Sequence, residues 1–114
     1  VACGEHNAPS KSGNMTRYAA IALTPTSQDW IPGYLGTVTG LVDKHGGRYL
    51  ARTASHERIE GKGDDPALMV IIEWPSAEAA KAFYSDPEYQ PHLQARLAGA
   101  DNHFFLVEGK DDFA

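Results

Sequence analysis

Two short segments of this chain are apolar at every position, and their placement predicts the fold. One is Met69–Ile72, which ends in Glu73 and a Trp-Pro pair, and the other is Phe104–Val107 near the end of the chain. Both are too short for helices and are rich in β-branched or aromatic residues, which favours buried strands. The complete set of predicted strands covers residues 17–23, 48–53, 67–74 and 103–107, with a continuation of the second strand to residue 59 left open.

Helical spacing of apolar residues occurs in three segments between these strands. The first covers about residues 30–45 and stops at Gly46-Gly47, despite the Pro and Gly residues inside it. Ser76 is a predicted N-cap for a helix over 77–84, and Ser85-Asp86-Pro87-Glu88 predicts the start of a further helix that runs to about Gly99. The inward-facing residues of this last helix are predicted to be Tyr89, His92, Leu93, Arg96, Leu97 and Ala100.

The resulting order is β-α-β-β-α-β with the second helix split, which is the ferredoxin-like α+β pattern with a four-stranded antiparallel sheet. Helices would cover one face of that sheet, yet 69–72 and 104–107 are apolar on both faces. The chain has no spare element to cover the second face, so two copies are predicted to pack sheet against sheet as a homodimer. A monomer would expose an aggregation-prone apolar patch.

Several short motifs across residues 17–109 together resemble a known family. They are 45–52 (HGGRYLAR), 60–61 (EG), 71–76 (IIEWPS), 83–90 (FYSDPEYQ), Arg96 and 107–109 (VEG). With these motifs, the chain resembles domain-of-unknown-function family 1330, within the dimeric α+β barrel superfamily. Pro32, Gly33 and residues 1–14 depart from that pattern.

The resemblance implies the fold and the dimer but no established activity. The wider superfamily includes cofactor-free monooxygenases, lyases and dehalogenating or decarboxylating enzymes that act on small aromatic and polyketide compounds, alongside members with no known chemistry. A shared fold does not determine function.

Composition narrows the classes of partner and compartment. At 114 residues the chain fits one domain, predicted over 15–114, with residues 1–14 as an irregular tail. Met15 would be the true start, or Val1-Ala2-Cys3-Gly4 would be the remnant of a lipoprotein signal. The net charge of −5 argues against nucleic acid and acidic membrane surfaces. A single cysteine and no stretch of about 20 apolar residues favour a cytoplasmic protein.

Glu73 is the first candidate for catalysis. It follows an apolar strand on the same face as Met69 and Ile71, and partial burial of a carboxyl group raises its pKa toward that of a useful acid or base. A second strand continuing to residue 59 would place Arg52 opposite Glu73, which is the preferred register, whereas a strand ending at Thr53 would place Arg48 there. An ion pair that only holds the sheet edge is the structural alternative.

The last predicted helix presents a second group of polar side chains. Tyr89, His92 and Arg96 lie at i, i+3 and i+7, so they share one side of that helix. They could line a site for a small acidic or carbonyl-bearing ligand, with His92 as an acid–base group, and Trp30 and Tyr34 could supply an aromatic wall. The alternative is that the aromatic residues are ordinary core and that Arg96 pairs with a carboxylate.

Two principal functions remain open from the sequence. In one, the protein is a cofactor-free enzyme or binding protein for a small organic acid or aromatic carbonyl compound, with Arg52 and Arg96 holding an anionic group and Tyr89 or His92 donating to an oxyanion. In the other, Glu73, Arg52 and Arg96 form a closed salt network in a non-catalytic dimer. The histidines show no metal-ligand spacing, and no phosphate loop or dinucleotide fingerprint is present, so no metal or cofactor is predicted.

Overall fold

The computed structural model describes residues 15–114, and the predicted N-terminal tail over 1–14 lies outside them. The elements are β1 (Arg17–Pro25), α2 (Ile31–Lys44), β2 (Arg48–Thr53), β3 (Leu68–Trp74), α3 (Ala77–Ser85), α4 (Gln90–Gly99) and β4 (Ala100–Glu108). This order confirms the predicted βαββαβ arrangement with a split second helix.

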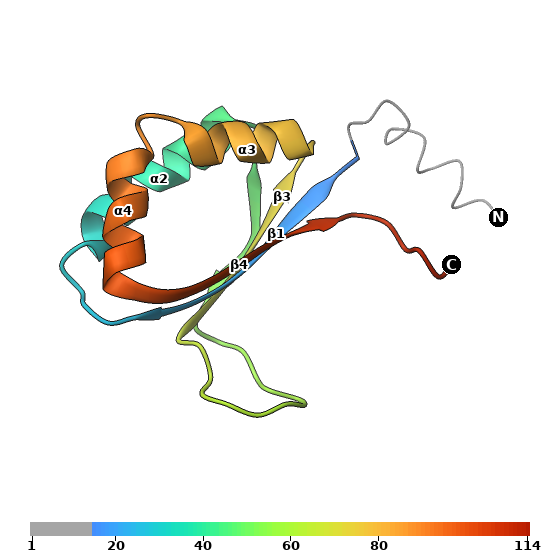
Figure 1. Cartoon of the computed structure of the whole chain (residues 1–114), viewed down its shortest axis with the longest axis horizontal. Coiled ribbons are helices and arrows are strands. Elements are labelled where there is room, and N and C mark those ends of the chain that lie inside the picture. Colours follow the sequence, from blue (N-terminus) through green and yellow to red (C-terminus); the bar gives the residue numbers. More distant parts are fainter. Residues whose placement is uncertain (1–14) are drawn as a thin grey trace.

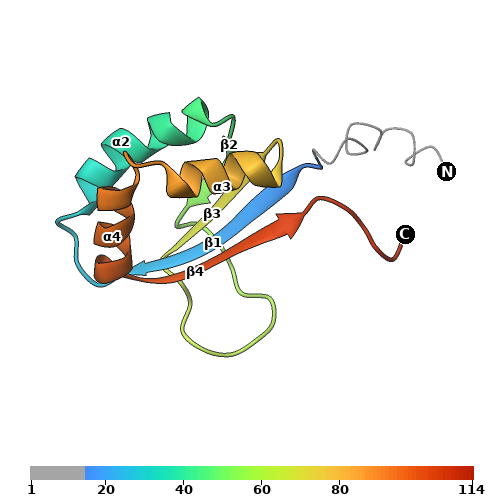
Figure 2. The ribbon, with the colours of Figure 1, turned by 45° about the horizontal axis from the view of Figure 1, so that its top comes forward.

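All strand pairs are antiparallel, and the sheet order is β2-β3-β1-β4. The three helices lie on one side of the sheet, and the loop between β2 and β3 extends away from it (Figures 1 and 2). The chain therefore has the predicted ferredoxin-like α+β fold. Within residues 15–114, no helix is long and apolar enough to cross a membrane.

Alternation along the central strands explains which face the helices cover. In β1, Ala19, Ile21 and Leu23 are buried beneath the helices, as every second residue of a strand faces the same side. Next to them, the rings of Trp74, Phe83 and Tyr89 form a continuous stack with centroid separations of 5.2 and 4.4 Å. Aromatic pairs of this kind add about 0.5–1.5 kcal/mol each beyond the free energy of burial.

The helix ends follow the sequence signals in two of three cases. Ser76 accepts a hydrogen bond from the backbone N–H of Ala79 and caps α3 as predicted. Gly46, with φ of +85°, ends α2 in the left-handed conformation that glycine tolerates best. The predicted start of the last helix at 85–88 is wrong, because Ser85 ends α3, the residues from Asp86 to Tyr89 form a turn, and α4 begins at Gln90.

Asp86 is the physical reason for that later start. Its Oδ1 accepts a hydrogen bond from the backbone N–H of Glu88 at 2.8 Å, which stabilises a turn. One residue of the predicted inward stripe is also misplaced. Leu97 is 48% exposed, because it lies about 100° around the helix from buried Arg96.

The opposite face of the sheet carries no helix in the described chain (Figure 2). Phe105 is 65% exposed there, and its neighbours Val107 and Ile71 are exposed as well. The prediction that β3 and β4 are apolar on both faces is thus confirmed.

The preferred register between β2 and β3 is wrong. β2 ends at Thr53, and Arg48, not Arg52, lies opposite Glu73, while Arg52 pairs with Val70. A β-bulge between Tyr49 and Ala51 inserts one residue, and an extra residue reverses the side of the sheet on which later side chains lie. Consequently Arg52 faces the helices, and Arg48 faces away from them.

Candidate functional site

A cavity of about 280 Å³ lies between the helix-covered face of the sheet and the helices. Its wall is mostly aliphatic and aromatic, and the residues that line it are Ile21, Leu23, Pro25, Trp30, Ile31, Tyr34, Leu35, Val38, Val42, Tyr49, Arg52, Leu68, Val70, Ile72, Phe83, Tyr89, Arg96 and Phe104. All five predicted ligand-binding residues are therefore brought together: Arg52, Tyr89, Arg96, Trp30 and Tyr34. Apolar clefts with a few polar groups are typical of small-molecule sites.

The polar part of this wall centres on Arg96. This side chain is only 2% exposed, and its Nη1 donates a hydrogen bond to Oδ1 of Asn102 at 2.6 Å. Its Nη2 donates to the phenol oxygen of Tyr89 at 3.2 Å, and that phenol lies 3.1 Å from the phenol oxygen of Tyr34. The Nε atom is buried and has no partner within the described residues. The expected carboxylate partner of Arg96 is not observed there.

Burial also determines the protonation state of the neighbouring phenols. Desolvation by burial, with a smaller contribution from Tyr89, raises the pKa of Tyr34 far above its ordinary value. Burial likewise raises the pKa of Tyr49. At neutral pH these phenols keep their protons, so they can donate hydrogen bonds to a ligand but cannot act as ready bases.

Arg52 lies at the rim of the same cavity, between β2 and α2. Its guanidinium carbon is 3.9 Å from the centre of the Tyr49 ring, and its Nη1 donates a hydrogen bond to Thr39 at 2.9 Å. The residue is exposed. A cation stacked over an aromatic face at an opening can reach a ligand group that projects from the cavity.

Trp30 and Tyr34 form the aromatic wall that the sequence predicts. Their rings meet edge to face at 5.4 Å, and the Trp30 indole N–H lies 3.0 Å from the carbonyl of Ser27 and 3.1 Å from that of Gly99. A Cβ atom at Gly99 would lie 2.4 Å from the indole nitrogen. Glycine at this position therefore allows the end of α4 to approach Trp30.

The two predicted catalytic residues do not line the cavity. Glu73 lies on the face of the sheet away from the helices, 2.8 Å from Arg48, and its side chain is 32% exposed. His92 is partly buried, and its ring centre is 6.5 Å from that of Tyr34. The hypothesis of a closed network of Glu73, Arg52 and Arg96 is wrong, because Arg52 and Arg96 bind other partners and Glu73 lies on the opposite face.

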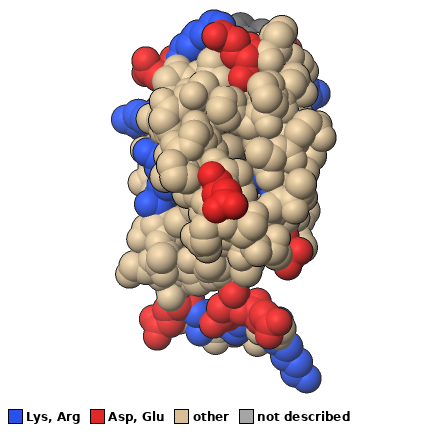
Figure 3. All heavy atoms as spheres, turned by 90° about the vertical axis from the view of Figure 1, so that its left-hand side faces the viewer, with Lys and Arg blue, Asp and Glu red and all other residues tan. Residues whose placement is uncertain are grey.

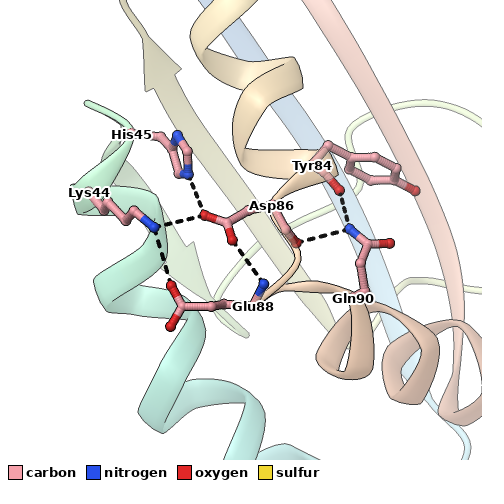
Figure 4. A network of polar contacts seen from close by, with 6 residues as sticks. All are labelled: Lys44, His45, Tyr84, Asp86, Glu88 and Gln90. Atoms are coloured by element: carbon pink, nitrogen blue, oxygen red, sulfur yellow. Dashed lines mark hydrogen bonds and ion pairs between the residues drawn. The ribbon is translucent and has the colours of Figure 1, made fainter.

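Sequence reasoning missed a second polar cluster at the junction of α2 with the α3–α4 turn (Figure 4). Asp86 Oδ2 accepts hydrogen bonds from His45 Nε2 at 2.7 Å and from Lys44 Nζ at 3.1 Å. Lys44 also pairs with Glu88 at 3.2 Å, and the Gln90 amide donates to two backbone carbonyls of the turn. The His45 bond, the Glu88 N–H and Lys44 together lower the pKa of Asp86 to about 2.

This cluster is a structural junction. None of its residues lines the cavity, and each side chain pairs with another charge or with the backbone. The motif 85–88 was interpreted only as a helix start, and nothing in the sequence links it to His45, about forty residues away. The general position of His45 at the end of the first helix was predicted correctly.

Two further properties limit the possible chemistry. In the part of the chain that the structure describes, no three His, Cys, Asp or Glu side chains gather where they could hold a metal ion. The end of the molecule formed by α2 and α4 is covered largely by uncharged side chains, with an acidic group near its centre, basic groups along one edge and further charged groups above and below (Figure 3). The surface around this end of the fold is thus suited to apolar rather than highly charged compounds.

Solved structures show the same fold at low sequence identity. A protein of unknown function from Rhodopseudomonas palustris, RPA0582, is 16% identical with a TM-score of 0.72, and the similarity covers 94% of this chain and 93% of that one. SnoaB, a cofactor-independent oxygenase from Streptomyces nogalater, is 15% identical with a TM-score of 0.62, over 87% and 97% of the two chains.

Comparison of the sequence with protein families is more decisive. No curated protein matches the chain significantly. The model of one family, described as a domain of unknown function, DUF1330, matches residues 16–110 and so includes every strand and helix of the described chain. This chain therefore belongs to the DUF1330 family, as its sequence motifs indicated.

Proposed function

We propose that this protein binds a small, largely apolar organic compound, either an organic acid or an aromatic carbonyl compound, in the cavity between sheet and helices. One observation carries the proposal: the cavity of about 280 Å³ has an aliphatic and aromatic wall that also contains a buried arginine and three phenols, two of which belong to the hydrogen-bonded group around that arginine. Ligand sites combine apolar walls and a few polar groups in this way. If this region served only for packing, side chains would be expected to fill it, because protein interiors are close-packed.

Binding is better supported than catalysis. The cavity wall presents hydrogen-bond donors, and among the described residues no carboxylate lines it. Glu73 could act as an acid or base only on the other face of the sheet. His92 remains the candidate general base, because its ring packs against Tyr34, which does line the cavity. The likeness to SnoaB at 15% identity shows the fold and does not extend that protein's oxygenase activity to this chain.

A cavity-filling variant tests the proposal. The purified protein would be screened by native mass spectrometry and thermal shift against small aromatic acids, ketones and neutral aromatic compounds. Leu35→Trp should fill the cavity, because Leu35 lines it yet is partly exposed, so the larger ring can be accommodated. The steric overlap would cost about 1–3 kcal/mol of binding free energy, which weakens binding by roughly tenfold or more.

Leu97→Trp is the matched control. Leu97 is as exposed as Leu35 and lies on a neighbouring helix, but it does not line the cavity. Ligands that bind wild type and Leu97→Trp equally and bind Leu35→Trp poorly would support the proposal. Equal binding to both variants, or no binding by any compound of the panel to wild type, would contradict it.

A homodimer through the open face of the sheet is the second part of the proposal. Phe105, Val107 and Ile71 are exposed together on that face, and a second copy offers an identical apolar surface. In size-exclusion chromatography with light scattering, wild type should have the mass of a dimer and Phe105→Asp that of a monomer. Phe113→Asp is the control, because Phe113 lies beyond the sheet. A wild-type monomer at tens of micromolar would contradict this part.

A further inference from the structure

We infer that Arg96 and the adjoining phenols bind the carboxylate of the cavity's ligand, so that the ligand is an apolar compound with a single negative charge. This inference rests on the proposed function and goes beyond it in two ways. It chooses the organic acid over the neutral carbonyl compound, and it fixes which end of the ligand lies against α4.

Arg96 carries a buried positive charge beside the cavity. Its side chain is almost completely buried and stays protonated under all ordinary conditions. Its two hydrogen-bond partners, Asn102 and Tyr89, are neutral. A buried charge is costly unless an opposite charge accompanies it. Within residues 15–114, the salt bridges involve other cations, so the positive charge beside the cavity has no protein anion to balance it.

This end of the cavity has more hydrogen-bond donors than acceptors. Arg96 Nη2 donates to Tyr89, and the contact between Tyr89 and Tyr34 uses the proton of only one of the two phenols. One phenolic O–H is therefore left over, and Nε–H of Arg96 is a second donor with no partner among residues 15–114. Buried donors without acceptors are rare in folded proteins.

Those two spare donors define the group that would complete the site. The high pKa of Tyr34 keeps its phenol protonated, so the site offers donors and a positive charge but no free negative charge. A carboxylate has two oxygens that only accept hydrogen bonds, and it carries the missing charge. A neutral amide or alcohol brings a donor of its own and no charge, and it fits less well.

The remaining wall determines the rest of the ligand. Between Arg96 and the rim, the side chains are aliphatic or aromatic, among them Val38, Val70 and Phe104. An apolar cavity of about 150 Å³ suffices for benzene. The space of about 280 Å³ therefore suits an acid with one or two rings, or a short branched chain. Arg52 at the rim could contact a polar substituent at the far end.

The test compares one apolar body carrying different head groups. Binding of 2-naphthoate, 2-naphthamide and 2-naphthalenemethanol to the full chain would be measured by isothermal titration calorimetry at pH 7. A charge-assisted hydrogen bond in a buried site is worth enough for 2-naphthoate to bind roughly 10- to 100-fold tighter than the amide. Tyr34→Phe, which removes only a hydroxyl group, should reduce that preference several-fold.

Arg96→Met is the stronger variant, and it should abolish the preference while retaining weak binding of the neutral compounds. Arg48→Met is its matched control and should leave the ratio unchanged, since Arg48 lies on the opposite face of the sheet and does not line the cavity. Circular dichroism and the melting temperature establish that each variant is folded, and Tyr34→Phe serves if Arg96→Met does not fold. Equal affinities for acid and amide in wild type would overturn this inference and leave the proposed function standing. Failure of all three compounds, together with the wider panel, would overturn both.

Discussion

The Asp86 junction and the Arg96 end of the cavity differ in whether a buried charge is paired with an opposite one. Asp86 is buried, with 7% of its surface exposed, and it receives hydrogen bonds from His45, Lys44 and a backbone N–H. Arg96 is buried more deeply, and within the described part of the chain its partners are neutral and one of its nitrogens has none. The chain can therefore satisfy an interior charge where the fold requires it, and it leaves one unbalanced beside the apolar cavity between sheet and helices.

That difference separates a structural role from a binding role. Asp86 joins the end of α2 to the α3–α4 turn, because its partners come from these two segments (Figure 4). Arg96 is held by Asn102 of β4 and by Tyr89, and it lines the cavity. Residues of functional sites commonly lower the stability of the folded state, whereas residues that join elements of the fold raise it. Substitutions at the two sites should thus have opposite consequences for stability and binding.

Loss of the Asp86 carboxylate should give the largest change in stability. Asp86→Ala removes the acceptor shared by His45, Lys44 and the turn, and it leaves their donors unsatisfied at a partly buried junction. The melting temperature should fall by roughly 5–10 °C, which is typical when a small domain loses such a contact. Asp43→Ala, at an exposed position of α2 next to Lys44, is the control and should melt as wild type does. An unchanged melting temperature for Asp86→Ala would show that the junction contributes little.

Lowering the pH should remove the stabilising contribution of the Asp86 carboxylate in the wild-type protein. The pKa of Asp86 in the folded chain is about 2, below its ordinary value of 3.8, so the folded state binds the proton less readily than the unfolded state. Its contribution to stability is complete above about pH 4 and is lost as the pH falls toward 2. Urea unfolding measured across that interval should show the loss in wild type and a smaller pH dependence in Asp86→Asn. Equal slopes would assign acid sensitivity to other carboxylates.

The contrast between these sites also shows how far the sequence could be interpreted. Apolar runs at 69–72 and 104–107, together with cap and turn residues, were sufficient for the order of elements and the fold, because local patterns decide them. The partnership of His45 with Asp86 could not be predicted, since it depends on where two distant helix ends meet. The helix start at Gln90 was missed for a related reason: the same Asp86 signal can stabilise a turn or a helix.

Replacing the buried arginine should alter stability less than replacing Asp86. Arg96→Met removes an unbalanced charge and fills its volume with a flexible apolar chain, a change that is often neutral in buried sites. Asn102 loses one donor but keeps its bond to the carbonyl of Ala100. The melting temperature should remain within about 4 °C of wild type, which corresponds to roughly 1 kcal/mol in a small domain. A fall as large as that of Asp86→Ala would instead make Arg96 a structural residue.

Candidate site residues were predicted with uneven success, and the bulge in β2 explains most of the difference. Residues on helices kept their predicted side, so Tyr34, Tyr89 and Arg96 meet in the cavity. Arg52 reached the same cavity for a reason that the sequence did not reveal. The extra residue between Tyr49 and Ala51 moved it to the helix-covered face and left Glu73 opposite Arg48. A single unpaired residue of this kind leaves no composition signal, so strand register was the weakest inference.

The pair of Arg48 and Glu73 should therefore matter least of the three charged sites. Its N–O distance of 2.8 Å is short, but the Arg48 side chain is 71% exposed, so water competes for both charges. Exposed pairs of this kind contribute about 0–1 kcal/mol. Glu73→Gln and Arg48→Gln should each change the free energy of unfolding within that range, as measured by urea titration. They should also leave ligand affinity unchanged, because neither residue lines the cavity. Loss of a measured binding or turnover on Glu73→Gln, with Arg48→Gln unaffected, would move the functional centre from the cavity to the open face of the sheet.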